Sequence, residues 1–322
     1  METITWSSQS EADEEIDEED ESNIYIHGIP IPSQILAEVL VRVDNRRDVG
    51  YICPLICRRW YSVLSAPGFW ISYMIYRSMD LPPNSLRNEP SLNVKKVSLM
   101  QAFGRNLISN PSGDDRYESW EMGENGGDGF GIEKPPVGCV PVENIPVAFV
   151  TSYDWCSKFQ IIDLWKEGIE RSFLDEFCPP ITVSEYHTGR FNCPSIYLLE
   201  VQLLPDGIMP LPYRPMPGFL VYARYPRLSQ QYDTPGDEWI HRDVPQRDET
   251  TDTSITRIRM LKEVEWRKIE HTFSNYPRGI RYVLFRHSGK DQQGYWDECY
   301  GSKMAKASVI VNYGNGERRF IP

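Results

Sequence analysis

The chain has 322 residues, 40% of them hydrophobic, which is enough for one large domain or two ordinary domains. Its net charge is −12, but nine acidic residues lie between positions 11 and 21, and the rest of the chain carries only −3. This near balance, without a basic stripe, argues against nucleic acid as a partner. The sequence contains no stretch of about 18 apolar residues, so we expect no transmembrane segment. The N-terminus lacks the basic start and apolar core of a secretion signal.

The residue types that carry catalysis or hold metals are scattered. Seven cysteines are spread along the chain without a Cys-x-x-Cys pair, which favours reduced thiols over disulfides or a zinc site. Five histidines show no ligand spacing, and neither Gly-x-Ser-x-Gly nor a phosphate loop occurs. Asp297 and Glu298 would diverge on a strand, unlike the facing carboxylates of a glycosidase. The sequence predicts a cytoplasmic, non-catalytic protein without metal or cofactor.

Residues 1–22 are polar and strongly acidic, and Ile16 is the only large apolar residue within the run of charges. Repulsion between like charges and the lack of apolar area predict a disordered tail. Such a run of acidic residues most often keeps a protein soluble, and the alternative is a tail that docks to a specific partner.

Two amphipathic helices are predicted between residues 31 and 70. Pro32 and Ser33 favour a helix start, because proline has no N–H to lose there. Apolar residues then recur at helical spacing in a stripe: Ile35, Leu36, Val39, Leu40 and Val43. A second apolar series, with Trp60 near its end, predicts another helix over residues 49–64. A unit of this size cannot bury all these side chains, so we expect a partner to cover some of them.

This stretch resembles an F-box. The resemblance rests on Ile31-Pro32-x-x-Ile35-Leu36-x-Glu38-Val39-Leu40, then Cys57-Arg58-Arg59-Trp60 and Phe69-Trp70. It implies a helical domain over residues 23–77 that binds a Skp-type adaptor and, through it, the cullin of a ubiquitin ligase. The implied adaptor-binding residues are Pro32, Ile35, Leu36, Val39, Leu40 and Trp60. The alternative is an ordinary helical hairpin packed on its own domain.

After a proline-containing connector at residues 78–103, the pattern changes to short β-branched and aromatic segments separated by Gly and Pro turns. Such segments predict an antiparallel β-sandwich. The expected strands lie within 147–153, 160–164, 181–186, 195–204, 264–270, 280–287 and 307–313. Because prolines block a central strand, residues 205–256 are predicted to be a long loop or partly ordered insertion.

Residues 104–322 resemble the F-box-associated domain of the sugar-recognising F-box proteins. The matching motifs include Gly104-Arg105-Asn106-Leu107, Asn110-Pro111-Ser112-Gly113, Thr151-Ser152-Tyr153-Asp154-Trp155-Cys156 and Tyr295-Trp296. The resemblance implies a jelly-roll sandwich like the galactose-binding folds. It also implies binding of high-mannose N-glycans on misfolded glycoproteins during ER-associated degradation, although other relatives keep this fold and bind no glycan.

Tyr295 and Trp296 follow a polar turn, and exposed aromatic rings at the end of a sandwich can stack on a sugar. We therefore predict them as the glycan platform, with Asn192 supplying hydrogen bonds. Asn192 stands where glycan-binding relatives carry an acidic residue, and Asp297 where they carry lysine. The alternatives are that the rings belong to the core, or that the chain recognises a protein face.

The leading interpretation is the substrate receptor of a Skp–cullin–F-box ubiquitin ligase that binds N-glycans through its sandwich. One alternative is a receptor in the same complex that recognises a protein surface without a glycan. Another is a free-standing lectin or carbohydrate-active enzyme whose helical hairpin is incidental. Co-purification with an adaptor separates the last from the others, and glycan binding separates the first two.

Overall fold

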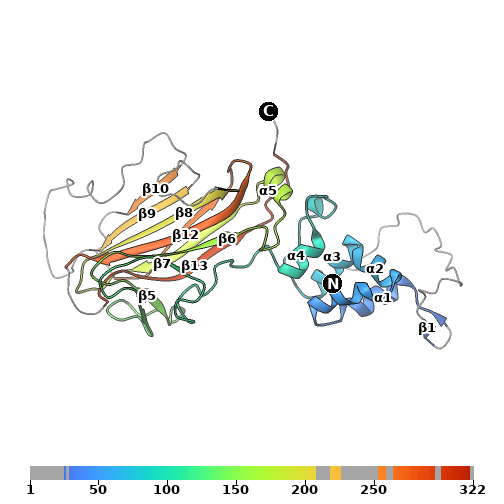
Figure 1. The fold of residues 1–322 in the computed structure, drawn as a ribbon, viewed down its shortest axis with the longest axis horizontal. Helices are drawn as coiled ribbons and strands as arrows, with labels where there is room; N and C mark the ends of the chain where they lie inside the picture. The colour runs from blue at the N-terminus through green and yellow to red at the C-terminus, as the bar shows by residue number, and fades with distance from the viewer. Residues whose placement is uncertain are drawn as a thin grey trace. The chain divides into compact units, whose positions relative to one another are not determined.

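The computed structural model describes residues 25–26, 29–207, 218–225, 253–258, 264–293 and 299–319. The chain divides into two compact units, Met1–Leu81 with Val94–Leu99, and Pro82–Asn93 with Met100–Pro322. The first unit is helical and the second is built on two β-sheets (Figure 1). The expected connector at 78–103 contributes to both units and contains η3 (Asn84–Leu86) and α4 (Val94–Met100). Among the described helices, none has the length and apolar character needed to cross a bilayer.

The first predicted helix is confirmed. After the two-residue strands β1 (Tyr25–Ile26) and β2 (Ile29–Pro30), helix α1 runs over Ser33–Val41, with Pro32 as its N-cap residue. The apolar stripe of this helix divides between two environments. Leu36 and Leu40 are buried within the helical unit, whereas Ile35 and Val39 are exposed.

The prediction of a single helix over residues 49–64 was wrong. The chain instead forms a π-helical turn η1 (Asp48–Ile52), a 3-10 turn η2 (Cys53–Leu55) and helix α2 (Arg58–Ser65). Pro54 cannot donate a helical hydrogen bond, and Cys57 is extended at φ −160° and ψ 169°. Helix α3 (Pro67–Tyr76) then follows a second proline start.

The core of the helical unit gathers on α3. Trp70 and Tyr73 are fully buried, and the Trp70 indole Nε1 donates to the Leu64 carbonyl oxygen over 2.8 Å. Phe69 meets Trp70 edge-on with ring centroids 5.2 Å apart. The Arg77 guanidinium lies 4.6 Å from the centroid of the Tyr73 ring. The closing aromatic pair of the sequence motif is therefore the centre of this unit's packing.

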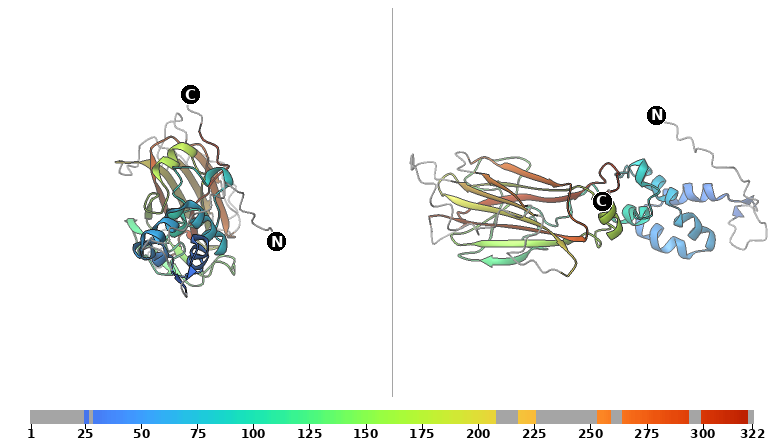
Figure 2. Two further views of the ribbon diagram at one scale, coloured as in Figure 1. Left: turned by 90° about the vertical axis from the view of Figure 1, so that its right-hand side faces the viewer. Right: turned by 90° about the horizontal axis from the view of Figure 1, so that it is seen from above.

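The second unit is the predicted β-sandwich, seen along its strands and from above in Figure 2. The six-stranded sheet has the order β10-β9-β8-β12-β6-β3, and the five-stranded sheet has the order β11-β7-β13-β5-β4. All pairings are antiparallel except that of β9 with β10. The strands are β3 (Glu121–Asn125), β4 (Gly131–Glu133), β5 (Ala148–Val150), β6 (Cys156–Asp163), β7 (Ile181–Thr188), β8 (Ser195–Pro205), β9 (Gly218–Tyr225), β10 (Thr253–Ile258), β11 (Arg267–Phe273), β12 (Ile280–Asp291) and β13 (Lys303–Val311).

Each segment expected to be a strand coincides in part with a strand of the sandwich. The sequence did not predict β3, β4 or helix α5 (Arg171–Phe177). It also expected a long loop or partly ordered insertion over 205–256, and the structure places β9 and the start of β10, two strands of the six-stranded sheet, within that interval. Both are at or next to the sheet edge, where neighbouring prolines are tolerated. Residues 208–217 and 226–252 of that interval, like the acidic tail at 1–22, lie outside the described residues.

A buried polar network crosses the interior of the sandwich. The Lys158 ammonium on β6 donates to His287 Nε2 on β12, and His287 Nδ1 donates to Glu185 Oε1 on β7 over 2.7 Å. The Tyr197 hydroxyl on β8 donates to the other Glu185 oxygen. All four side chains are fully buried, so their hydrogen bonds join the two sheets through the core.

Candidate functional site

Several connections meet at one end of the sandwich. Strand register places Asp291 of β12 beside Ser195 of β8, and Gly289 of β12 beside Cys156 of β6. On the other sheet, Lys303 of β13 pairs with both Val150 of β5 and Thr188 of β7. Asn125 of β3 also pairs with Cys156, and Gly131 of β4 with Val150. The connections at 126–130, 151–155 and 189–194, and the described ends of the connection from 292 to 302, therefore lie at the same end. Functional residues concentrate on loops that a rigid scaffold positions in this way.

Backbone hydrogen bonds hold these connections together. The Asp291 N–H donates to the Ser152 carbonyl over 2.9 Å, and the Gln292 N–H donates to the Pro194 carbonyl over 2.8 Å. The Gly301 N–H donates to the Thr151 carbonyl over 2.8 Å. A Cβ at Gly301 would lie only 2.6 Å from that carbonyl oxygen, so the close approach requires glycine.

The predicted glycan platform lies on one of these connections. Tyr295, Trp296 and Asp297 lie outside the described residues, so their role stays a prediction. The residues on either side of them are firmly held. Gln292 is bonded to Pro194, and the Cys299 thiol lies 3.9 Å from the Gly129 carbonyl oxygen.

Asn192 is partly buried on the 189–194 connection, whose Pro194 holds the start of the segment that carries the predicted platform. Its Oδ1 accepts a 2.9 Å hydrogen bond from Arg190 Nε. No residue in the described part of the chain accepts a hydrogen bond from its amide nitrogen, so both of its N–H donors can bond to a ligand. The expectation that Asn192 stands on a neighbouring loop agrees with this arrangement, and its contact with a glycan remains a prediction.

Two further side chains of this end were missed by sequence reasoning. Phe191 is 51% exposed and directly precedes Asn192, so it offers a second aromatic face. The Arg190 guanidinium lies 4.2 Å from the Tyr300 ring centroid and links the two connections. Phe191 could have been noticed as an aromatic residue in a polar loop. The Arg190–Tyr300 contact has no sequence signal, because the two residues are far apart along the chain.

Burial makes the Cys193 thiol of this end a weak nucleophile. Cys193 is fully buried, and burial together with the Asp291 carboxylate raises the pKa of its thiol to about 12. Burial also lowers the pKa of His287 to about 4, and that of His187 to about 3. These groups are closed off from solvent, so they serve packing rather than proton transfer with a ligand. No group of three or more His, Cys, Asp or Glu residues in the described segments could hold a metal ion.

The helical unit offers a different candidate surface. Large apolar side chains are exposed over residues 35–61, namely Ile35, Val39, Tyr51, Ile52, Leu55, Ile56 and Tyr61. Leu55 is the most exposed of them at 82%. Single exposed apolar residues are common, but seven within one small unit make it a candidate interaction surface. We call these seven residues the apolar surface.

The predicted adaptor-binding residues fall on and beside this surface. Ile35 and Val39 belong to it, and Pro32 is exposed at the start of α1. Leu36 and Leu40 are buried beneath it and position α1. Trp60 is partly buried, with its Nε1 buried and not hydrogen bonded within the described residues. The sequence did not single out Tyr51 or Tyr61, because an aromatic residue in a helical pattern can equally be a buried core residue or an exposed contact residue.

Comparisons with known proteins identify the family of the chain. Residues 99–212 and 249–311 match the family described as "F-box associated region". F-box only protein 17 of Homo sapiens is 30% identical over 296 residues, which cover 87% of this chain and 91% of the relative. F-box only protein 6 of Mus musculus is 27% identical over 89% of this chain and 84% of its own length. F-box only protein 2 of Bos taurus is 27% identical over 87% of this chain and 82% of its own length. The chain belongs to the F-box only proteins that carry an F-box associated region.

Proposed function

We propose that the chain is the substrate-recognition subunit of a Skp–cullin–F-box ubiquitin ligase in the cytoplasm. The observation that supports this most is the apolar surface of the helical unit, in a chain of the F-box only family. An exposed apolar surface of this kind needs a partner to cover it. A Skp-type adaptor would cover it and connect the chain to the cullin, while the sandwich remains available for substrate.

We propose further that the sandwich binds high-mannose N-glycans of misfolded glycoproteins destined for ER-associated degradation. The glycan would contact Tyr295 and Trp296 by stacking, and Asn192 by hydrogen bonds. Asp297 would be a secondary determinant, since a carboxylate only accepts hydrogen bonds. The amide donors of Asn192, which no described residue accepts from, and the exposed ring of Phe191 support this end of the sandwich as the ligand site.

The adaptor proposal is tested by co-purification with a Skp-type adaptor. Leu55 and Ile56 are 82% and 59% exposed, so replacing both by serine removes apolar contacts without opening the core. We expect the L55S/I56S double variant to lose the adaptor. Leu40 is only 1% exposed and is unsuitable for this test, because its replacement would unsettle the helical unit itself.

Ile161 is 40% exposed on the sandwich and provides a matched control, since Ile161→Ser also removes an exposed apolar side chain. This variant should retain the adaptor. Retention of the adaptor by L55S/I56S would contradict the proposed surface. Failure of the wild-type chain to bind any Skp-type adaptor would instead favour the free-standing lectin.

A receptor for a protein surface is the second candidate function. It is favoured by the departure at Asp297, because an acidic side chain there removes a hydrogen-bond donor from the predicted glycan site. Glycan titration distinguishes the two candidates.

A further inference from the structure

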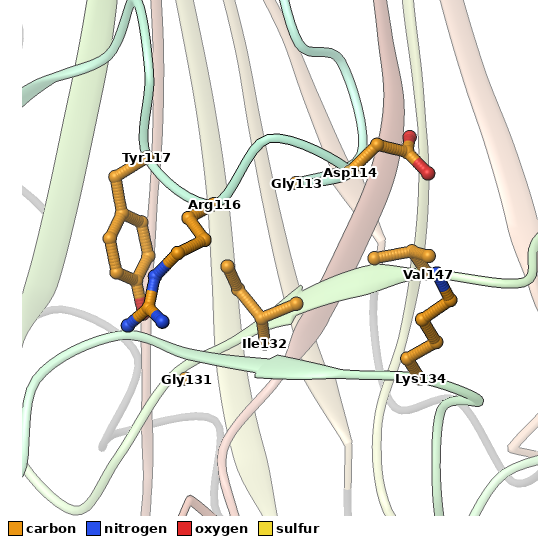
Figure 3. A pocket seen from close by; sticks show the side chains of 8 residues that line it. All are labelled: Gly113, Asp114, Arg116, Tyr117, Gly131, Ile132, Lys134 and Val147. Atoms are coloured by element: carbon orange, nitrogen blue, oxygen red, sulfur yellow. The ribbon is translucent and has the colours of Figure 1, made fainter.

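A pocket of about 390 Å³ lies beside β4, the edge strand of the five-stranded sheet. It is lined by Gly113, Asp114, Arg116, Tyr117, Gly131, Ile132, Lys134 and Val147 (Figure 3). None of these residues belongs to the connections at 151–155, 189–194 or 292–302. The volume is at the lower end of the roughly 300–1,000 Å³ typical of small-molecule sites.

The pocket has two polar ends and an apolar middle. In Figure 3, the Arg116 guanidinium lies next to Tyr117 on one side of Ile132. Lys134 and Asp114 lie on the other side, near Val147. A ligand that fills this pocket would therefore meet a cation at one end, an apolar surface in the middle, and a donor with an acceptor at the other end.

The charges of the pocket are available to a ligand. Neither Arg116 nor Lys134 forms an ion pair within the described residues. The neighbouring carboxylate, Glu133, is already paired with Lys303 over 2.9 Å. Two cations and one carboxylate leave the lining with a single positive charge, which suits a monoanion better than a dianionic phosphate.

The loop that presents Arg116 is held in place. Arg116 has a left-handed backbone with φ +58°, a conformation that costs a non-glycine residue about 1 kcal/mol or more. The Asn110 side chain donates to the Arg116 carbonyl over 3.0 Å and to the Glu118 carbonyl over 3.2 Å. Its Oδ1 accepts from the Asp115 N–H over 3.2 Å. Backbone strain that the surroundings maintain in this way is characteristic of ligand sites.

We propose that this pocket binds an acidic monosaccharide. Arg116 would hold the carboxylate through paired N–H donors, the sugar ring would lie over Ile132, and the hydroxyl groups would bond to Asp114 and Lys134. A neutral sugar would leave Arg116 without its anion. An acidic peptide side chain has no hydroxyl groups that could donate hydrogen bonds to Asp114. The lining of this pocket does not include Asn192, Tyr295 or Trp296, and the proposal does not depend on the glycan proposed for those residues.

The test is a titration of the full chain with methyl glucuronide and methyl glucoside, two sugars that differ only in the carboxylate. We expect saturable binding of the glucuronide and at least about tenfold weaker binding of the glucoside, as expected for a charge-assisted hydrogen bond. Arg116→Gln should weaken glucuronide binding by a similar factor. Lys268→Gln makes the same change of charge on β11, at the opposite edge of the sheet, and should leave binding unchanged.

Several results would overturn the proposal. These are equal binding of the two sugars, unchanged glucuronide binding by Arg116→Gln in a variant with wild-type melting temperature, and no binding by the wild-type chain. Tighter binding of glucose 6-phosphate would identify a phosphate site instead, and equal binding of a glutamate tetrapeptide would identify a peptide site. Trp296→Ala should retain glucuronide binding, so failure of the N-glycan proposal remains distinguishable from failure of this one.

Discussion

The Lys158 ammonium lies against His287 in the core of the sandwich, where it donates a hydrogen bond to the imidazole Nε2. It also lies 3.7 Å from the Trp120 ring centroid and 3.1 Å from that of Phe149. Burial lowers the pKa of Lys158 well below its ordinary value, while the Glu185 carboxylate acts to raise it. The aromatic rings and the nearby Glu185 carboxylate, which accepts hydrogen bonds from His287 and Tyr197, partly offset the loss of hydration of Lys158.

Lys158→Met should destabilise the sandwich by about 1–3 kcal/mol, because His287 Nε2 loses its buried hydrogen-bond partner and the Glu185 carboxylate loses its favourable interaction with Lys158. Urea unfolding of wild type and variant measures this loss. The double variant Lys158→Met with Glu185→Gln should recover part of it, since the buried charge is then removed as well. Wild-type stability of the single variant would contradict the proposed coupling between the two sheets.

Stability should fall on mild acidification. Burial lowers the pKa of His287 to about 4 and that of His187 to about 3, whereas an unfolded histidine titrates near 6.5. The unfolded chain therefore binds more protons as the pH falls below 6.5, and the folded state loses stability until the folded pKa is reached. At pH 5 the loss should be about 2 kcal/mol for each imidazole relative to neutral pH.

Urea midpoints at pH 7.5 and pH 5 measure this dependence. His187 stacks on Tyr197 with ring centroids 4.2 Å apart, so His187→Phe preserves an aromatic stack and should remove about half of the pH-dependent loss. Equal free energies of unfolding for the wild type at the two pH values would show that neither imidazole is kept neutral by burial.

Gly301→Ala should destabilise the loop end of the sandwich by about 1–3 kcal/mol, because the new methyl group would press on the Thr151 carbonyl. Thermal unfolding measures the effect. Gly68→Ala is the control, since no atom lies within 4 Å of a Cβ there and the residue is helical. If both alanine variants have the melting temperature of the wild type, the close packing of Gly301 against Thr151 is incorrect.

The sequence predicted the sandwich because β8 and β12 carry long β-branched and aromatic stretches between turns. Strand β9 escaped prediction because prolines flank it on both sides and suggest loop. The interior network could not be predicted either. A lysine such as Lys158 in an alternating strand reads as a solvent-facing residue, and its partner Glu185 comes from the opposite sheet.

The candidate sites were predictable to different degrees. Ile35 and Val39 are exposed, but helical spacing alone could not separate them from the buried Leu36 and Leu40, since all four lie on one broad stripe. Asn192 was expected on a loop near the aromatic pair, and its 189–194 loop is bonded to Gln292 through Pro194. The pocket at Arg116 had no sequence signal, because it forms where a loop of left-handed residues lies beside an edge strand.

The most direct test of substrate recognition is calorimetric titration of a chitobiose-containing high-mannose glycan into wild type, Trp296→Ala and Asp297→Lys. Trp165→Ala is the matched control, because Trp165 is 47% exposed just after β6, at the opposite end of that strand from Cys156. We expect wild type and Trp165→Ala to bind the glycan. Trp296→Ala should lose about 2 kcal/mol, or roughly thirtyfold in affinity, and Asp297→Lys should bind more tightly. Equal binding by wild type and Trp296→Ala would contradict the proposed platform, and no binding by either wild type or Asp297→Lys would contradict glycan recognition altogether.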